Sequence, residues 1–243
     1  MKRTLIAALL VLAVPLAARA DTITITNVPG GSPGGYLPLS LFGIAPIAGV
    51  TDDGVVNLDT GVFSYAGETW NRIGFASNGF LIVGGGAEGT SANQTFPDPA
   101  GPNNVLAPFW TDLDPTAGGA LRIGYLTDGV RTWMVTDWQD VPLAGTAILN
   151  SFQIWIGING VEDIYFVYGE TGAPALLTVG AENKTGAFGA NYFVNGVGTR
   201  PGRTSELQVS TSGLPEAVPE PASTLLLFSI GLVGLRAARN RWQ

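Results

Sequence analysis

Apolar and polar residues alternate with a period of two along much of this chain. The alternation begins at residues 22–26, where Ile23 and Ile25 are interleaved with threonines. Because successive side chains of a strand point to opposite faces, this pattern predicts a half-buried strand. Similar runs recur between regular turn signals, and we expect further strands at residues 62–65, 70–76, 80–83, 121–126, 130–138, 151–158, 163–168, 176–181, 190–194 and 207–210.

Three of the turns between these runs carry a hairpin signal. The pairs are Asn78-Gly79, Asp128-Gly129 and Asn159-Gly160, and these residue types tolerate the positive φ that tight hairpins need. Two stretches lack the alternation. Residues 29–50 are rich in Pro and Gly and are expected to form a loop or an edge strand, and residues 96–119 are expected to form the longest loop. About a dozen short antiparallel strands predict an all-β domain, an antiparallel β-sandwich or jelly-roll-like fold.

The first 20 residues do not fit this β pattern. They have a basic start at Lys2 and Arg3, an apolar run over residues 5–18, and Ala18 and Ala20 in an A-x-A arrangement. This order predicts a signal peptide, recognised by the general secretion machinery and cut by signal peptidase so that Asp21 begins the mature chain. An uncleaved membrane anchor is the alternative, although the apolar run is short for a bilayer span of about 20 residues.

The last residues, 215–243, have three parts in a fixed order. A Pro-Glu-Pro segment is followed by an apolar stretch, expected to be a hydrophobic transmembrane helix at about residues 222–235, and then by a basic tail. The prolines hold the first part extended, and the apolar helix would span only about 20 Å of a hydrocarbon core of roughly 30 Å. The arginines favour a cytoplasmic C-terminus. The expected signal residues are Pro219, Glu220, Pro221, Ala222, Ser223, Arg236, Arg239 and Arg241.

This C-terminal order resembles the PEP-CTERM sorting signal of Gram-negative bacteria. The resemblance implies recognition by an exosortase, a membrane-embedded protease that cuts near the Pro-Glu-Pro. It also implies that the protein is anchored transiently in the inner membrane and then delivered to the cell surface or extracellular matrix, with a link to exopolysaccharide and biofilm. A plain C-terminal tail anchor is the alternative. The chain thus divides into a signal peptide (1–20), a β domain (21–214) and a sorting signal (215–243).

Composition supports the β prediction and limits the kinds of partner and metal site that are expected. Charged residues make up only 13% of the chain, which also contains 34 Gly and 16 Pro, a balance typical of short strands and tight turns. Between residues 21 and 220, six Lys and Arg stand against 19 Asp and Glu, an excess of 13 negative charges. Such a surface repels phosphate backbones, so nucleic acid is not an expected partner. With no Cys and no His, disulfides and thiolate or imidazole metal sites are excluded.

Two short motifs stand in the central region. An S-N-G turn is followed by N-N-x-x-A-P-F-W-x-D-x-D, and their residues are Asn78, Gly79, Asn103, Asn104, Ala107, Pro108, Phe109, Trp110, Asp112 and Asp114. Over about residues 60–185 this pattern resembles the NIDO-like extracellular domain. The resemblance implies a β-sandwich of the kind used in secreted and adhesive surface proteins.

Oxygen donors gather in the 96–119 segment. Asp98, Asn103, Asn104, Asp112 and Asp114 are of the hard ligand type that Ca²⁺ prefers, although their spacing does not fit an EF-hand. The same residues also stabilise turns by bonding to nearby backbone. Turn formation is therefore the first interpretation of these residues, and a calcium site at Asp98, Asp112 and Asp114 is its alternative. No other cofactor is expected.

We expect a non-enzymatic surface or matrix protein. Asp52-Asp53 and Glu162-Asp163 are adjacent acids, and neighbours on a strand point to opposite faces, so neither pair suits glycoside hydrolysis. Serine catalysis without His would need Lys184 as its base. The alternatives are a secreted carbohydrate-binding module and, less well supported, a glycosidase. A sugar-stacking platform could use the aromatic rings of Trp70, Trp110, Trp133, Trp138 and Trp155, although rings on alternating strands more often belong to the core.

Overall fold

The computed structural model describes residues 22–158, 160 and 162–212, which belong to one compact unit. Within these residues the chain forms 13 strands and one short 3-10 helix, η1 (Leu39–Phe42). The predicted signal peptide, its cleavage site and the predicted sorting signal lie outside the described residues. The observed elements confirm the all-β prediction.

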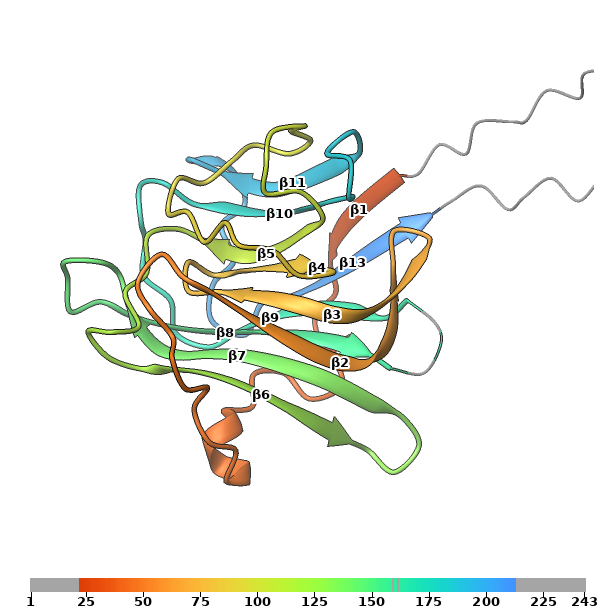
Figure 1. Cartoon of the computed structure of the whole chain (residues 1–243), viewed down its shortest axis with the longest axis horizontal. Coiled ribbons are helices and arrows are strands. Elements are labelled where there is room, and N and C mark those ends of the chain that lie inside the picture. Colours follow the sequence, from red (N-terminus) through yellow and green to blue (C-terminus); the bar gives the residue numbers. More distant parts are fainter. Residues whose placement is uncertain (1–21, 159, 161, 213–243) are drawn as a thin grey trace, which may run out of the picture. The chain divides into compact units, whose positions relative to one another are not determined.

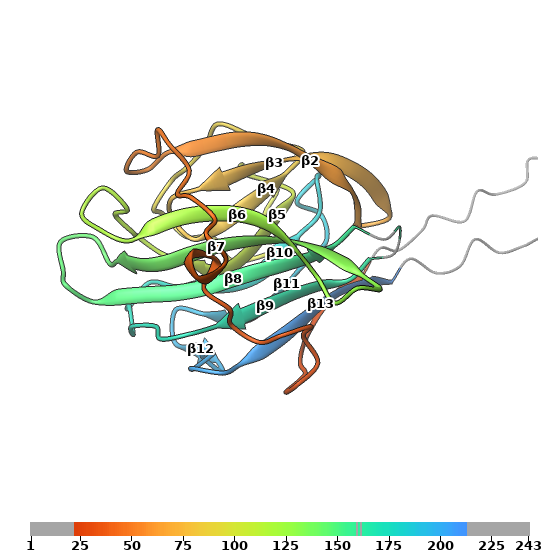
Figure 2. The same cartoon turned by 90° about the horizontal axis from the view of Figure 1, so that it is seen from below.

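The strands form two antiparallel sheets that face each other, as Figures 1 and 2 show. Sheet A has six strands in the order β1-β13-β9-β8-β7-β6, and sheet B has seven in the order β12-β11-β10-β5-β4-β3-β2. The strands of sheet A are β1 (Thr22–Asn27), β6 (Ala120–Thr127), β7 (Thr132–Pro142), β8 (Leu149–Gly157), β9 (Ile164–Tyr168) and β13 (Glu206–Ser212). The strands of sheet B are β2 (Val55–Tyr65), β3 (Glu68–Ala76), β4 (Phe80–Val83), β5 (Val105–Trp110), β10 (Thr178–Glu182), β11 (Gly189–Val194) and β12 (Val197–Gly198).

The core between the sheets is built around Trp138 on β7. Its ring meets Phe75 of sheet B edge-on at a centroid distance of 4.4 Å and stacks on Phe152 of sheet A at 4.9 Å. Its Nε1 donates to the Ala76 carbonyl at 3.0 Å. The ring and its one polar atom therefore both tie sheet A to sheet B, which is how a buried indole satisfies its N–H.

Long loops cover parts of both outer faces of the sandwich. Loop 28–50, which contains η1, places Leu39 against Trp133 and Trp155 on sheet A. Loop 84–104 places Phe96 against Trp110 on sheet B, with ring centroids 6.0 Å apart. Residues 29–50 are therefore a loop and not an edge strand, and their apolar positions are explained by this covering role.

The prediction of one continuous loop over residues 96–119 was wrong, because β5 lies within it. All six residues of β5 are buried, between β4 and β10 in sheet B. Pro108 argued against a strand here, because proline lacks the N–H that a regular ladder of hydrogen bonds needs. The register with β10 shifts between Thr178 and Gly180, which face Trp110 and Ala107, so that Pro108 lies at an irregularity where a proline is tolerated.

The other predicted strands are confirmed with small changes in their bounds. The largest change is in β2, which begins at Val55 instead of residue 62. The Asn78-Gly79 and Asp128-Gly129 turns join β3 to β4 and β6 to β7 as predicted. Asn159 lies outside the described residues.

Both described chain ends lie at the same end of the sandwich. Thr22 of β1 is the cross-strand partner of Ser212 of β13. We call this the exit end, and it lies on the right in Figure 1. Strand β13 runs toward it, whereas β7 and β9 run away from it to the far end, where β7 finishes at Pro142.

Candidate binding pocket and acidic cluster

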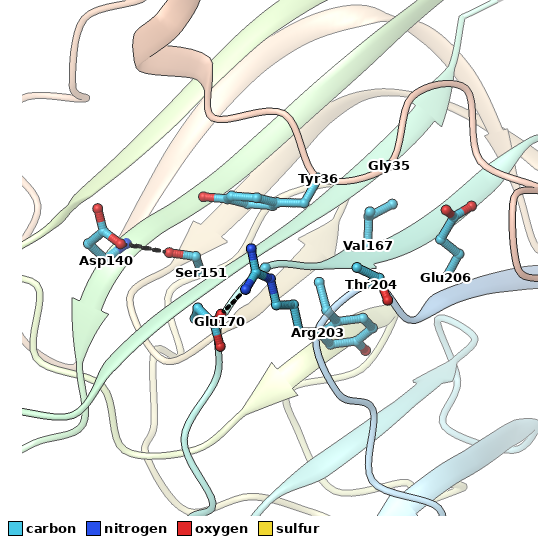
Figure 3. Close-up of a pocket in the computed structure, with 11 residues that line it drawn as sticks. Gly35, Tyr36, Asp140, Ser151, Val167, Glu170, Arg203, Thr204 and Glu206 are labelled. Atoms are coloured by element: carbon cyan, nitrogen blue, oxygen red, sulfur yellow. Dashed lines mark hydrogen bonds and ion pairs between the residues drawn. The ribbon is translucent and has the colours of Figure 1, made fainter.

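A pocket of about 370 Å³ lies at the far end of sheet A. Its walls come from loop 28–50, from the ends of β7, β8, β9 and β13, and from the segment before β13 (Figure 3). It combines the aromatic rings of Tyr36 and Tyr168 with hydroxyl, carboxylate and guanidinium groups, a mixture suited to a small polar ligand. The side chains that matter are Tyr36, Asp140, Ser151, Glu170, Arg203 and Glu206.

The charged groups of this pocket already have protein partners. Ser151 Oγ donates to Asp140 Oδ1 at 2.9 Å, and Arg203 pairs with Glu170 at 2.8 Å. Glu206 Oε2 accepts from the backbone N–H of Ser32 at 2.7 Å. The acids here thus hold loops and strand ends together, and none of these contacts aligns two free carboxylates across the cleft, as a glycosidase would need.

Tyr36 closes one side of the pocket. Its ring lies on Gly169, where an added Cβ would come within 2.9 Å of ring carbon Cδ1, so any side chain at position 169 would displace the ring. The hydroxyl donates to Asp137 Oδ1 at 3.3 Å. Burial, helped by the nearby Asp137 charge, raises the pKa of Tyr36 well above its usual value. The phenol therefore stays neutral and remains a donor.

Asp137 fastens loop 28–50 to the outer face of sheet A. Its buried carboxylate accepts from the Leu39 N–H at 2.9 Å. Gln153 makes a two-way contact beside it, accepting from the Leu37 N–H at 3.2 Å and donating to the Leu37 carbonyl at 2.5 Å. Burial raises the pKa of Asp137 to about 6, against the lowering effect of hydrogen bonds from the Leu39 N–H and from the Gln153 and Tyr36 side chains.

This raised pKa predicts a specific pH dependence of stability. The folded protein keeps a proton on Asp137 between pH 3.8 and about 6, where the unfolded chain loses it. The stability from this group is therefore fully present below pH 3.8 and is lost as the pH rises to about 6, by an amount on the order of 3 kcal/mol. Asp137→Asn should remove this component, measured as the difference between the two proteins in urea unfolding from pH 4 to 7. If the unfolding free energies of the two proteins change with pH in the same way, this pH dependence does not come from Asp137.

A cluster of acids lies where the chain enters β2 and leaves β5. Asp52, Asp53 and Asp112 place one carboxylate oxygen each within 4.8 Å of one another. Asn78 ties this region together, because its Nδ2 donates to Asp53 Oδ1 at 2.6 Å and its Oδ1 accepts from the Leu113 N–H at 2.8 Å. Desolvation, and then the negative charge of Asp53, raise the pKa of Asp112.

This cluster corrects the grouping predicted for calcium. Asp98 lies elsewhere, beside β10, where its N–H donates to Glu182 Oε2 at 3.0 Å. Asp114 Oδ1 accepts from the Thr116 N–H at 2.9 Å, so its main contacts are those of a turn. Of the three predicted ligands only Asp112 belongs to the cluster. Its partners come from about 60 positions earlier in the chain, a distance over which spacing carries no signal.

We therefore predict that calcium binds at Asp52, Asp53 and Asp112 instead. Added calcium should raise the melting temperature, because a ligand bound only by the folded state stabilises it by mass action. Asp112→Asn should remove the increase, whereas Asp98→Asn, the matched change at a predicted ligand outside the cluster, should keep it. If the melting temperature is the same in calcium and in chelator, the acids of the cluster stabilise turns and do not bind calcium.

The predicted platform of five tryptophans does not form. Trp110, Trp133, Trp138 and Trp155 are at most 3% exposed, which confirms the core alternative for these four. Only Trp70 keeps a partly exposed ring. The adjacent acids Glu162 and Asp163 also have structural contacts: Glu162 accepts from the Ala66 N–H at 3.1 Å, and Asp163 accepts from Trp133 Nε1 at 3.4 Å.

Comparison with known families decides the identity of the domain. A family model described as NIDO related matches residues 32–222, most of the chain. The chain belongs to the NIDO-related family. A second model, for the PEP-CTERM protein-sorting motif, matches residues 217–241 of this NIDO-related protein. No curated protein and no solved structure gave a match.

The second match supports export of the NIDO-related protein through an exosortase, a membrane protease, with transient membrane anchoring before it reaches the surface or the exterior. Among the described residues, no helix has both the length and the apolar character to cross a membrane. The helix predicted at residues 222–235 lies outside them.

Asn78 and Gly79 of the motif serve the fold of the NIDO-related domain. Gly79 has a φ of +81°, and a Cβ there would stand 2.1 Å from the Phe109 carbonyl oxygen, so only glycine allows this approach to β5. The Phe109 N–H donates to the Gly79 carbonyl at 3.2 Å, beside the contacts of Asn78 described above. The S-N-G turn thus clamps the end of β5, which explains why the two halves of the motif occur together.

Proposed function

We propose that this protein acts without enzymatic chemistry at the cell surface or in the extracellular matrix of a Gram-negative bacterium, in connection with exopolysaccharide and biofilm. The sorting motif that follows the folded domain carries this proposal. The pairing of the charged groups in the far-end pocket supports a binding or structural role over a catalytic one.

Incubation of the purified protein with exopolysaccharide from its host tests this proposal. The protein should sediment with the polymer and should release no reducing ends from it over many hours. Release of reducing ends, lost when Asp140 or Glu170 is changed to the amide, would overturn the non-enzymatic role in favour of a glycosidase. A secreted carbohydrate-binding module, the alternative, would also sediment with the polymer. It would differ because the sorting signal would not hold it at the membrane.

A further inference from the structure

A second pocket, at the exit end, combines the partly exposed tryptophan with a buried polar atom that lacks a partner. It has a volume of about 220 Å³ and lies between the β2–β3 turn, the residue before β5 and the β10–β11 turn. At about 30 Å³ per water, this space equals that of roughly seven waters and is enough for one sugar ring. Its lining includes Glu68, Trp70, Asn104, Lys184 and Phe188.

Asn104 supplies the unpartnered atom. The residue is 5% exposed, and its Nδ2 donates to the Val83 carbonyl at 2.7 Å while its backbone N–H donates to the Asn183 carbonyl at 3.0 Å. Its Oδ1 is buried and has no hydrogen-bond partner among the described residues. Oδ1 has less than 1 Å² of accessible surface, and leaving such an acceptor unsatisfied costs about 1–3 kcal/mol, so a ligand donor gains this hydrogen bond when the side chain turns toward the pocket.

The aromatic side of the pocket is fixed in position. The Trp70 ring lies against Gly84, where an added Cβ would come within 2.9 Å of ring carbon Cζ3. Its Nε1 donates to the Tyr65 carbonyl at 3.2 Å, which holds the indole in one orientation. Phe188, 39% exposed, adds a second apolar surface. Rings held in this way offer apolar area to a ligand at little cost in conformational entropy.

The charges at this pocket cancel each other. Lys184 Nζ pairs with Glu68 Oε1 at 2.5 Å, and both side chains remain about half exposed. The pair presents a donor and an acceptor side by side, which suits two neighbouring hydroxyl groups. It offers no net attraction to an ion, and the surplus of acids over the domain as a whole repels anionic ligands.

We propose that this pocket binds one ring of an uncharged saccharide. The apolar face of the ring packs on Trp70 and Phe188, one hydroxyl donates to Asn104 Oδ1, and neighbouring hydroxyls meet the Lys184–Glu68 pair. The far-end pocket is the weaker candidate, because its charged groups satisfy one another. The inference rests on the proposed function, because the proposed function places the protein in the exopolysaccharide matrix, where it would meet this ligand.

Titration of the full chain, in zwitterionic detergent, with methyl glycosides of D-glucose, D-galactose and D-mannose tests the site by ligand-observed NMR. At least one glycoside should bind, and D-glucuronate should bind more weakly than D-glucose. Trp70→Ala and the more exposed Phe188→Ala should each weaken that binding about tenfold through lost apolar contact. Phe42→Ala, a matched change at a residue 52% exposed on loop 28–50, should leave it unchanged.

Three results would overturn the proposal. Binding of none of the glycosides would mean that ordered water satisfies Asn104 Oδ1. Binding that survives both Trp70→Ala and Phe188→Ala but is lost in Tyr36→Ala would assign the ligand to the far-end pocket. Preferred binding of glucuronate would contradict the charge argument. Processing of the same variants in cells is measured separately, so normal sorting without sugar binding overturns only this site.

Discussion

Changing Pro219, Glu220 and Pro221 together to alanine is expected to abolish C-terminal processing and to leave the precursor in the inner membrane. The prolines keep this segment extended, which suits a protease that needs an unstructured substrate. Alanine is the best helix former, so the change should let the apolar helix extend upstream and hide the cleavage site. Immunoblots of membrane and extracellular fractions measure the outcome as the ratio of precursor to shortened protein.

Neutral replacements at Arg236, Arg239 and Arg241 provide the comparison. They leave the Pro-Glu-Pro intact and remove the charges that favour a cytoplasmic C-terminus, so the precursor should pass through the membrane instead of accumulating in it. If the triple-alanine variant is processed and released like the original protein, the Pro-Glu-Pro is ordinary linker and a plain tail anchor explains the C-terminus.

Trp138→Ala is expected to destabilise the domain by about 3–5 kcal/mol, the range for removing a large aromatic side chain from a core. Trp138 is fully buried and contacts both sheets through Phe75 and Phe152. The change also leaves the Ala76 carbonyl without its donor. For a domain of this size the melting temperature should fall by roughly 10 °C or more.

Urea unfolding followed by circular dichroism measures this effect, with Phe42→Ala as the control. Phe42 is 52% exposed, so its removal should change the unfolding free energy by less than about 1 kcal/mol. Equal stabilities of the two variants would mean that the sheets are held together elsewhere than at Trp138.

Period-two alternation was enough to predict strands such as β8. There Phe152, Ile154 and Ile156 point into the sandwich, and Ser151, Gln153 and Trp155 alternate with them on the other face, which is buried as well. This alternation, with the turn signals, made the class of fold predictable. It failed for β5, which reads as a continuous apolar run containing a proline.

The sites were less predictable than the fold, because they depend on contacts between distant parts of the chain. Nothing in the spacing of residues joins Asp52 and Asp53 to Asp112, or places Asn104 beside Trp70. Likewise, the composition of residues 28–50 marks a loop, and only the packed structure shows Tyr36 and Leu39 bound to Asp137. Such contacts are set by sheet order and register, which local patterns do not encode.

The intact mass of the protein recovered from its native cells tests the account most directly, because the central claim is an exported domain processed at both ends. We expect a chain that begins at Asp21 and ends near the Pro-Glu-Pro at residues 219–221, together with any group attached there. Recovery of the unprocessed 25.2 kDa chain, with Met1 and Gln243 both present, would contradict it.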